Sequence, residues 1–216
     1  MKKAYTLTAI ASAAALLAGS ASAGTTNVGL SWNNDFLVGT KSLNDGKPAL
    51  QGYAEHWFDN GFFVGAWFSQ VDWGTADKYE IDTYLGYFKA FGPTTVNLGL
   101  VAFNYDDYGH DYVQAWVDFD HYFTEDFALG TKIKYAFDNN YNYDWRYVLT
   151  SDYKASDKTS FAAEYQIDPS NDTHEWKVSA AYAMTDQFSA KITYAVSDFA
   201  SDKVGFSLNW ATSFGG

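Results

Sequence analysis

The sequence contains no cysteine and only three prolines, and both shortages restrict what the chain can be. Without cysteine there can be no disulfide framework and no thiolate metal site. The prolines lie at a turn, in a loop or at the start of a β-like run, where a missing N–H does no harm. Beyond the N-terminal region no stretch reaches the about 18 unbroken apolar residues of a membrane helix. Helical membrane spans are therefore not expected.

Basic residues are also scarce, because 14 Lys and Arg face 26 Asp and Glu and give a formal net charge of −12. Phosphate binding depends on Lys and Arg, so this balance argues against nucleic acid as a partner. Aromatic residues, in contrast, are abundant, with 8 Trp, 17 Tyr and 17 Phe. A water-soluble domain would struggle to bury so many rings, which indicates an apolar environment around the folded chain.

The N-terminal region has the layout of a secretory signal peptide. Two lysines give a positive start, residues 9–17 are almost entirely apolar, and residues 21–23 form a small-residue cleavage pattern. An uncleaved membrane anchor is the alternative, but the apolar stretch is shorter than the roughly 20 residues that span a bilayer. We therefore expect residues 1–23 to be a signal peptide and residues 24–216 to form one secreted domain.

Apolar and polar residues alternate in nine successive runs from Lys78 onward. In the first of these, Tyr79 and Ile81 alternate with Glu80 and Asp82. Alternation sustained over about ten residues is the signal of a β-strand rather than of a helix. Three earlier runs, whose facing is less regular, bring the total to twelve: residues 26–40, 48–58 and 62–73. An even number of strands suits a bacterial outer-membrane barrel.

The connections between these runs alternate in length. Short turn signals occur at residues 59–61, 91–93, 124–126, 156–158 and 185–187, and longer connections at 42–47, 106–110, 138–144 and 168–172. Short turns on one side and longer loops on the other are typical of the periplasmic and extracellular ends of such a barrel. The predicted fold class is all-β: a transmembrane antiparallel up-and-down β-barrel of about twelve strands.

Aromatic placement separates a membrane barrel from a soluble one. Rings recur at both ends of the apolar sets, as in Tyr79 and Tyr87 or Trp145 and Tyr153, which is typical of girdles at two membrane interfaces. A soluble lipocalin-like barrel is the alternative, and it would turn the apolar set inward. The opposite face carries glycine and charged residues that suit a hydrated interior, so we expect a location in the cell outer membrane. The expected partners are outer-membrane lipid and lipopolysaccharide, and, through the terminal aromatic Phe214, the barrel-assembly machinery.

Several segments of the first half of the domain resemble a known family. They are residues 27–30, 34–36, 45–52, 61–67 and 80–87, of which the Asp-Gly-Lys-Pro-Ala motif at 45–49 is the most specific. These segments are similar to those of TorF family porins, also known as a conserved hypothetical family of Gram-negative bacteria. The resemblance implies an outer-membrane porin without an assigned substrate. Family members commonly carry an Arg-Gly pair where this chain has Val38-Gly39, so no role of that arginine is carried over.

The polar partners of the apolar runs form a candidate lumen lining. These residues are Glu80, Asp82, Tyr84, Tyr112, Gln114, Trp116, Asp118, Asp120, Lys132, Lys134, Arg146, Asp152, Glu164, Glu175, Lys177 and Lys191. Their charges nearly balance. Acidic and basic stripes on opposing walls would orient ions or small dipolar solutes in a narrow pore. The alternative is a ladder of salt bridges that fills the barrel, with Asp118 and Lys132 as a cross-strand pair.

Most of the acidic excess falls in the predicted extracellular loops, at Asp106, Asp107, Asp111, Asp138, Asp144, Asp168, Asp172, Asp198 and Asp202. These charges would raise the cation concentration at the mouth of a pore. We therefore expect a narrow, weakly cation-preferring channel for passive diffusion of ions or small polar solutes. A closed structural or surface-interaction barrel is the alternative.

An enzyme is not expected, because the four scattered histidines form no motif with a serine nucleophile. A membrane-embedded hydrolase would need such a pair to converge at one rim, for example at His110 or His174. The sequence also contains no phosphate-binding loop and no metal-binding helix motif. No cofactor and no metal site are predicted.

Overall fold

The computed structural model describes residues 24–137 and 144–215, and in this part of the chain all regular structure is β. Twelve strands form one closed sheet: β1 (Gly24–Asn33), β4 (Ala49–Phe58), β5 (Phe62–Gln70), β6 (Tyr79–Phe91), β7 (Thr94–Tyr105), β8 (Gly109–Thr124), β9 (Phe127–Phe137), β10 (Asp144–Lys154), β11 (Thr159–Asp168), β12 (Thr173–Ala183), β13 (Phe188–Ser197) and β14 (Lys203–Gly215). A two-stranded ribbon, β2 (Leu37–Val38) and β3 (Lys41–Ser42), lies between β1 and β4. The predicted signal peptide and Asp138 lie outside the described residues.

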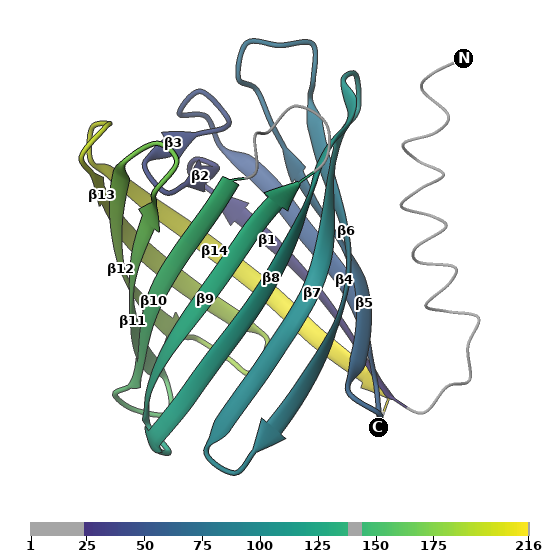
Figure 1. Ribbon diagram of the computed structural model, residues 1–216, viewed down its shortest axis with the longest axis vertical. Helices are drawn as coiled ribbons and strands as arrows, with labels where there is room; N and C mark the ends of the chain where they lie inside the picture. Colours follow the sequence, from purple (N-terminus) through teal and green to yellow (C-terminus); the bar gives the residue numbers. More distant parts are fainter. Residues whose placement is uncertain (1–23, 138–143, 216) are drawn as a thin grey trace.

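Every barrel strand is antiparallel to both of its neighbours, and sequential strands are adjacent throughout (Figure 1). The sheet closes where β1 pairs with β14, for example at Leu30 and Trp210, as well as with β4. Closure matters because an open edge would leave unpaired backbone N–H and C=O groups, which lipid cannot satisfy. The all-β fold with twelve antiparallel strands, predicted from the alternation, is thus confirmed.

The two faces of the sheet differ in the way that the alternation predicts. Large apolar side chains such as Leu30, Leu85 and Leu149 are more than half exposed on the outside of the barrel. The alternate residues face inward, where rings from strands that are not neighbours meet: Phe63 on β5 lies 6.5 Å from Trp116 on β8. An apolar outer surface around a polar interior is typical of a transmembrane barrel rather than of a water-soluble one.

The connections β4–β5, β6–β7, β8–β9, β10–β11 and β12–β13, of two to four residues, lie at one end of the barrel, which we call the turn end (Figure 1). The other end, which we call the loop end, holds the remaining connections, most of them longer. Side chains build the short turns. Asn60 accepts the N–H of Phe62, and the hydroxyls of Thr124, Ser156 and Thr185 each accept a backbone N–H two residues ahead. Such local bonds favour turns over continued strand, which explains why these turn signals were readable in the sequence.

The predicted boundaries of two early strands were wrong. The first run was expected to extend to residue 40, but β1 ends at Asn33. Asn34 and Asp35 follow, and their side chains accept bonds from the N–H of Phe206 and the hydroxyl of Ser42 instead of continuing the ladder. The run predicted for residues 62–73 ends at Gln70 for a similar reason, because Val71 turns into the loop that precedes β6.

Within the described residues, no helix is long and apolar enough to span a membrane.

Candidate functional site: a lumen crossed by a folded strap

The segment between β1 and β4, residues 34–48, enters the barrel at the loop end, and we call it the strap. It contains β2 and β3. At one side of the lumen Phe36 of the strap packs against Trp67 of β5, with 5.4 Å between ring centroids. At the other side the backbone N–H of Thr40 donates to Glu175 of β12 (2.9 Å), and the Thr40 hydroxyl shares a 2.8 Å hydrogen bond with Ser197 of β13. The strap therefore bridges two facing walls.

An apolar cluster holds the strap against the first wall. Phe36 and Leu43 of the strap are buried with Ala49 and Val71, and the rings of Trp67, Trp73 and Tyr105 cover this cluster. The polar groups of the strap are bonded within it: the side-chain amide of Asn44 donates to the carbonyls of Lys47 and Pro48. Because its backbone is satisfied in this way, the strap forms a defined structure rather than a loose loop.

Gly39 is required where the strap meets the second wall. Its φ of +64° lies in the left-handed region that glycine adopts without strain. A β-carbon at this position would overlap the carboxylate of Glu175. Only a residue without a side chain lets the Thr40 N–H come within hydrogen-bond distance of that carboxylate.

Outside the lumen, charged groups tie the strap to the loop between β5 and β6. Lys47 forms ion pairs with Asp72 (2.8 Å) and Asp45 (3.5 Å), and Lys78 reaches Asp72 at 3.2 Å. The hydrogen bond and charge of Lys47, aided by those of Lys78, lower the pKa of Asp72, and the same contact raises the pKa of Lys47. Since all four side chains are exposed, this network contributes little energy and is weakened by salt.

Asp77 organises the neighbouring loops. Its carboxylate accepts the N–H groups of Asp107 (3.0 Å) and Tyr108 (2.9 Å) and the hydroxyl of Thr75 (2.9 Å). Burial alone would raise the pKa of Asp77, but these hydrogen bonds to the charged form outweigh it and lower the pKa. One acidic side chain thus connects the β5–β6 loop to the β7–β8 loop.

The strand register places all sixteen predicted lumen residues on the inner face of the barrel. Cross-strand partners on this face include Asp82 with Trp67, Trp116 with Gly99, and Lys134 with Arg146. Three large residues of this set, Tyr84, Tyr112 and Trp116, lie against other inward groups. Tyr84 donates to Glu55 (3.1 Å), and Tyr112 stacks on Phe103 with 4.4 Å between ring centroids.

One part of this inner face is acidic. We call it the acidic wall; its carboxylates are Glu55 on β4 and Glu80 and Asp82 on β6. Glu80 and Asp82 are only 4% and 7% exposed. The hydroxyl of Tyr105 donates to one oxygen of Glu80 (3.1 Å), but the Oε2 atom of Glu80 and the Oδ1 atom of Asp82 have no hydrogen-bond partner among the described residues. Buried carboxylates are ordinarily paired on both oxygens. Asp118 on β8 also has one buried oxygen without a hydrogen-bond partner, but its other oxygen forms an ion pair with Lys132.

The facing part carries most of the inward positive charge. We call it the basic wall; its cations are Lys132, Lys134, Arg146, Lys177 and Lys191, on β9, β10, β12 and β13. Some of them are paired: Lys132 meets Asp118 at 3.2 Å, as predicted for this cross-strand pair, and Lys177 meets Glu164 at 2.6 Å. Lys134 and Lys191 form no ion pair within 4 Å in the described part of the chain.

The two walls lie on opposite sides of the barrel. The acidic wall is centred on β5 and the basic wall on β11, and six steps separate these strands in either direction around the closed sheet. The strap lies between them, with a cavity on each side. A cavity of about 530 Å³ is bounded by Phe36 and Val38 of the strap and by the acidic wall. A cavity of about 220 Å³ lies between Leu37 and Gly39 of the strap and the two lysines Lys177 and Lys191.

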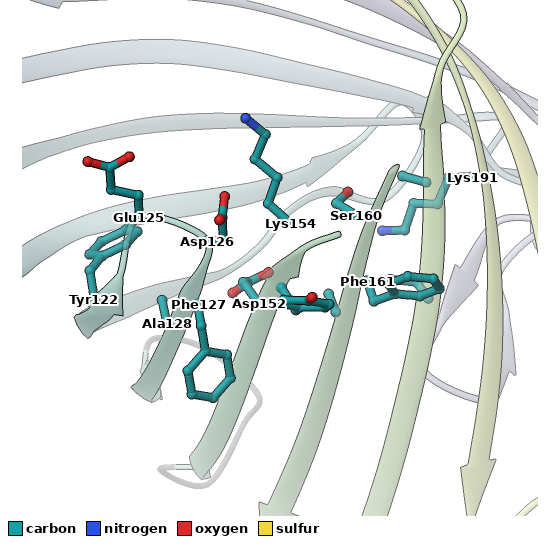
Figure 2. A pocket seen from close by; sticks show the side chains of 14 residues that line it. Tyr122, Glu125, Asp126, Phe127, Ala128, Asp152, Lys154, Ser160, Phe161 and Lys191 are labelled. Carbon is teal, nitrogen blue, oxygen red and sulfur yellow. The ribbon is translucent and has the colours of Figure 1, made fainter. Parts of the chain in front are cut away.

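A third hollow, of about 270 Å³, opens nearer the turn end. Figure 2 shows its side chains, which come from the β8–β9 turn and from the strands β8 to β13. Asp152 and Lys191 line both this hollow and a smaller one of about 140 Å³, whose lining comes from β10, β11, β12 and β13. Polar side chains therefore continue along the basic side from the strap toward the turn end.

Sequence reasoning missed two parts of this site. It read the strap as a strand followed by an open loop, and it did not assign the inward rings of β4 and β5. Trp57 stacks on Phe63 at 4.5 Å, and Phe63 in turn approaches Tyr84 at 6.3 Å. Both faces of these strands carry aromatic side chains, so the alternation of residue types does not show which face is inside the barrel.

The histidines do not form a catalytic group with a serine. His56 shares a hydrogen bond with Thr26, His121 with Thr94, and His174 with Tyr165, each on a different part of the barrel. His110 lies beside Asn104 at 3.2 Å. The convergence of Ser and His at one rim that a hydrolase requires is not found among these contacts.

Comparison with known proteins places the chain in a family. Residues 17–213 match the family described as "Bacterial protein of unknown function (Gcw_chp)". The chain belongs to this family. The TorF name suggested by the sequence motifs is not confirmed by this match and stays a prediction. No curated protein sequence matches the chain.

Among solved structures, the barrel is similar to porins and an outer-membrane channel. The KdgM porin in complex with disordered oligogalacturonate aligns with a TM-score of 0.65 at 9% identity, covering 88% of this chain and 99% of the porin. The NanC porin aligns with a TM-score of 0.55 at 15% identity, covering 88% and 98%. An outer membrane channel from Pseudomonas putida F1 aligns with a TM-score of 0.54 at 10% identity, covering 91% and 97%. At these identities the likeness shows the fold alone.

Proposed function

We propose that this protein is an outer-membrane channel for passive diffusion of ions and small polar solutes, with a weak preference for cations. The observation that carries the proposal is the acidic wall, which has no basic residue, facing across a closed barrel the wall that holds the inward lysines and Arg146 together with Asp152, Glu164 and Glu175. A barrel that served only as a membrane anchor would not need charge separated across its interior. The greasy exterior and the similarity to porins support the outer-membrane location.

Opposed walls of unlike charge set up a field across the pore rather than along it. Such a field orients a dipolar solute, and low-dielectric surroundings strengthen it. The strap narrows the lumen at the point where this field acts, because it lies between Glu80 and Asp82 on one side and Lys177 and Lys191 on the other. Small polar solutes would therefore pass in a preferred orientation, and larger ones would be excluded.

The preference for cations rests on the loop-end carboxylates. Several of them also hold loops together: Asp106 accepts the N–H groups of Lys78 (2.7 Å) and Tyr79 (3.0 Å), and Asp198 accepts that of His174 (3.0 Å). These hydrogen bonds fix the charges in place without neutralising them. A fixed ring of negative charge attracts cations to the mouth, and the attraction falls as ionic strength rises.

The test is a recording in planar bilayers with the refolded, purified barrel. We expect small, stable conductance steps, and in a KCl gradient a reversal potential of the sign that marks weak cation preference. Asp198→Asn combined with Asp106→Asn should reduce that preference, whereas Asp157→Asn, an exposed carboxylate at the turn end, serves as the matched control. A purified barrel that folds but passes no current would refute the channel.

A closed barrel that acts through its surface is the second candidate. The strap favours it, because Phe36 and Leu43 pack into a buried apolar cluster and Thr40 is bonded to the facing wall. The bilayer recording separates the two candidates when repeated on a barrel lacking residues 37–46. A channel increases its conductance when the strap is removed, and a lumen that is blocked throughout its length stays silent.

A further inference from the structure

The cavity on the acidic side of the strap is lined by carboxyl groups that no basic side chain balances. Three carboxylates contribute to its lining, Glu55, Glu80 and Asp82, and no described residue that lines it is basic. Two of these carboxylates are more than nine-tenths buried, and each has one oxygen without a hydrogen-bond partner. Burying a carboxylate without a partner is costly, and a positive group in the cavity beside these side chains would offset that cost.

The remaining walls of the cavity are aromatic. Tyr53, Trp67 and Tyr84 contribute rings from three neighbouring strands, and Phe36 adds a fourth from the strap. Aromatic faces attract cations through the negative potential above the ring, most strongly where water is excluded. Carboxylates surrounded by rings are the usual surroundings of an ammonium group, especially of a quaternary one that cannot donate hydrogen bonds.

A metal ion fits these surroundings poorly. Among the described residues, no group of three or more His, Asp or Glu side chains is placed to hold a metal ion. Ca²⁺ and Mg²⁺ also require six or more oxygen ligands, or several retained waters, whereas this lining is mostly rings. The volume of about 530 Å³ lies within the range of cavities that bind small organic molecules.

We propose that the cavity between the strap and the acidic wall binds a small organic cation of the alkylammonium class. Glu80 and Asp82 balance its charge, and Trp67 and Tyr84 contact its methyl groups. That such cations are also carried across the membrane rests on the proposed channel function, whereas binding itself does not. Val38 lies at the strap side of this cavity and is half exposed. A larger side chain at this position can therefore fill the cavity without altering the barrel wall.

The experiment measures binding of choline to the folded barrel in detergent, by calorimetry and by quenching of tryptophan fluorescence. Its neutral isostere, 3,3-dimethyl-1-butanol, has the same shape without the charge. We expect saturable binding of choline and at least roughly tenfold weaker binding of the isostere. Glu80→Gln and Asp82→Asn should each weaken choline binding by a similar factor. Asp118→Asn, a lumen carboxylate already paired with Lys132, should leave it unchanged.

Val38→Arg provides a test that does not remove a wall residue. Its guanidinium would occupy the cavity and pair with the carboxylates, so choline binding should be lost, while the uncharged Val38→Met retains it. Equal binding of choline and its isostere, or no binding of either to a folded barrel, would overturn the proposal. A barrel that conducts but does not bind choline refutes only this inference, and one that binds choline but never conducts refutes only the channel.

Discussion

Replacing Gly39 by alanine should release the strap from the basic side of the lumen. The substitution has two costs. A non-glycine residue in the left-handed region costs about 1–2 kcal/mol, and the new β-carbon overlaps the Glu175 carboxylate. Glu175 must then move away from the Thr40 N–H, which loses a hydrogen bond to a charged group worth about 1.5–3 kcal/mol. The sum of about 2.5–5 kcal/mol shifts the docked-to-undocked ratio by a factor on the order of 10² to several times 10³.

Hydrogen exchange at the Thr40 amide measures this shift directly, because that N–H exchanges only when the strap leaves Glu175. The matched control is Gly46→Ala, also in the strap. Gly46 has a φ of +70°, but a β-carbon there meets no atom within 4 Å. Gly46→Ala therefore carries the backbone strain without the overlap, and exchange at Thr40 should rise at most about thirtyfold.

The two variants together isolate the contact with Glu175. The conductance of the Gly39→Ala barrel should also rise above that of the Gly46→Ala barrel, since an undocked strap no longer crosses the lumen. If Thr40 exchanges no faster in Gly39→Ala than in Gly46→Ala, the Glu175 contact does not hold the strap and the reasoning fails.

Three further predictions concern the strap, the basic wall and the loops. Because the native chain has no cysteine, Thr40→Cys with Ser197→Cys gives a single disulfide where the two hydroxyls lie 2.8 Å apart. Oxidation to this disulfide should leave the conductance at the wild-type level. A complete block would show that ions pass only when the strap leaves the lumen. Lys134→Met with Lys191→Met should shift the reversal potential toward stronger cation preference, and an unchanged potential would mean that the unpaired lysines do not face the ion path. The pKa of Asp77 is lowered in the folded protein, so its ionised carboxylate stabilises the fold fully above the ordinary pKa of about 3.8, and this stabilisation is lost as the pH falls through the lowered pKa. Hydrogen exchange at the Tyr108 amide, corrected for its intrinsic rate, should therefore accelerate over that pH range in the native chain. Asp77→Asn should show no such acceleration.

The barrel could be predicted from the sequence because each strand faces lipid on one side and the polar lumen on the other, which makes apolar and polar residues alternate. From β6 to β14 this alternation is regular enough that both the positions of the strands and the face of each side chain can be predicted, as at Glu80 and Ile81. The Asp118–Lys132 pair could be predicted for the same reason, since a short turn fixes the register across it.

The strap could not be predicted, because its structure depends on contacts between residues that are far apart in the chain. Gly39 and Thr40 have no local feature that indicates Glu175 or Ser197 as partners. Phe36 and Val38 continue the alternating apolar pattern of β1, so the sequence alone favours a longer strand. Likewise, Glu80 and Asp82 could be assigned to the interior, but their closeness to Trp67 and to the strap depends on how the segment folds inward.

The position of the strap also sets an order of assembly. Its anchors, Glu175 and Ser197, lie 135 and 157 residues later in the chain than Thr40. They reach the strap only after the last strands have curled round and β14 has met β1. The bonds of Thr40 to this wall are therefore completed late and report that the barrel has closed, whereas the packing of Phe36 on Trp67 requires only the early strands.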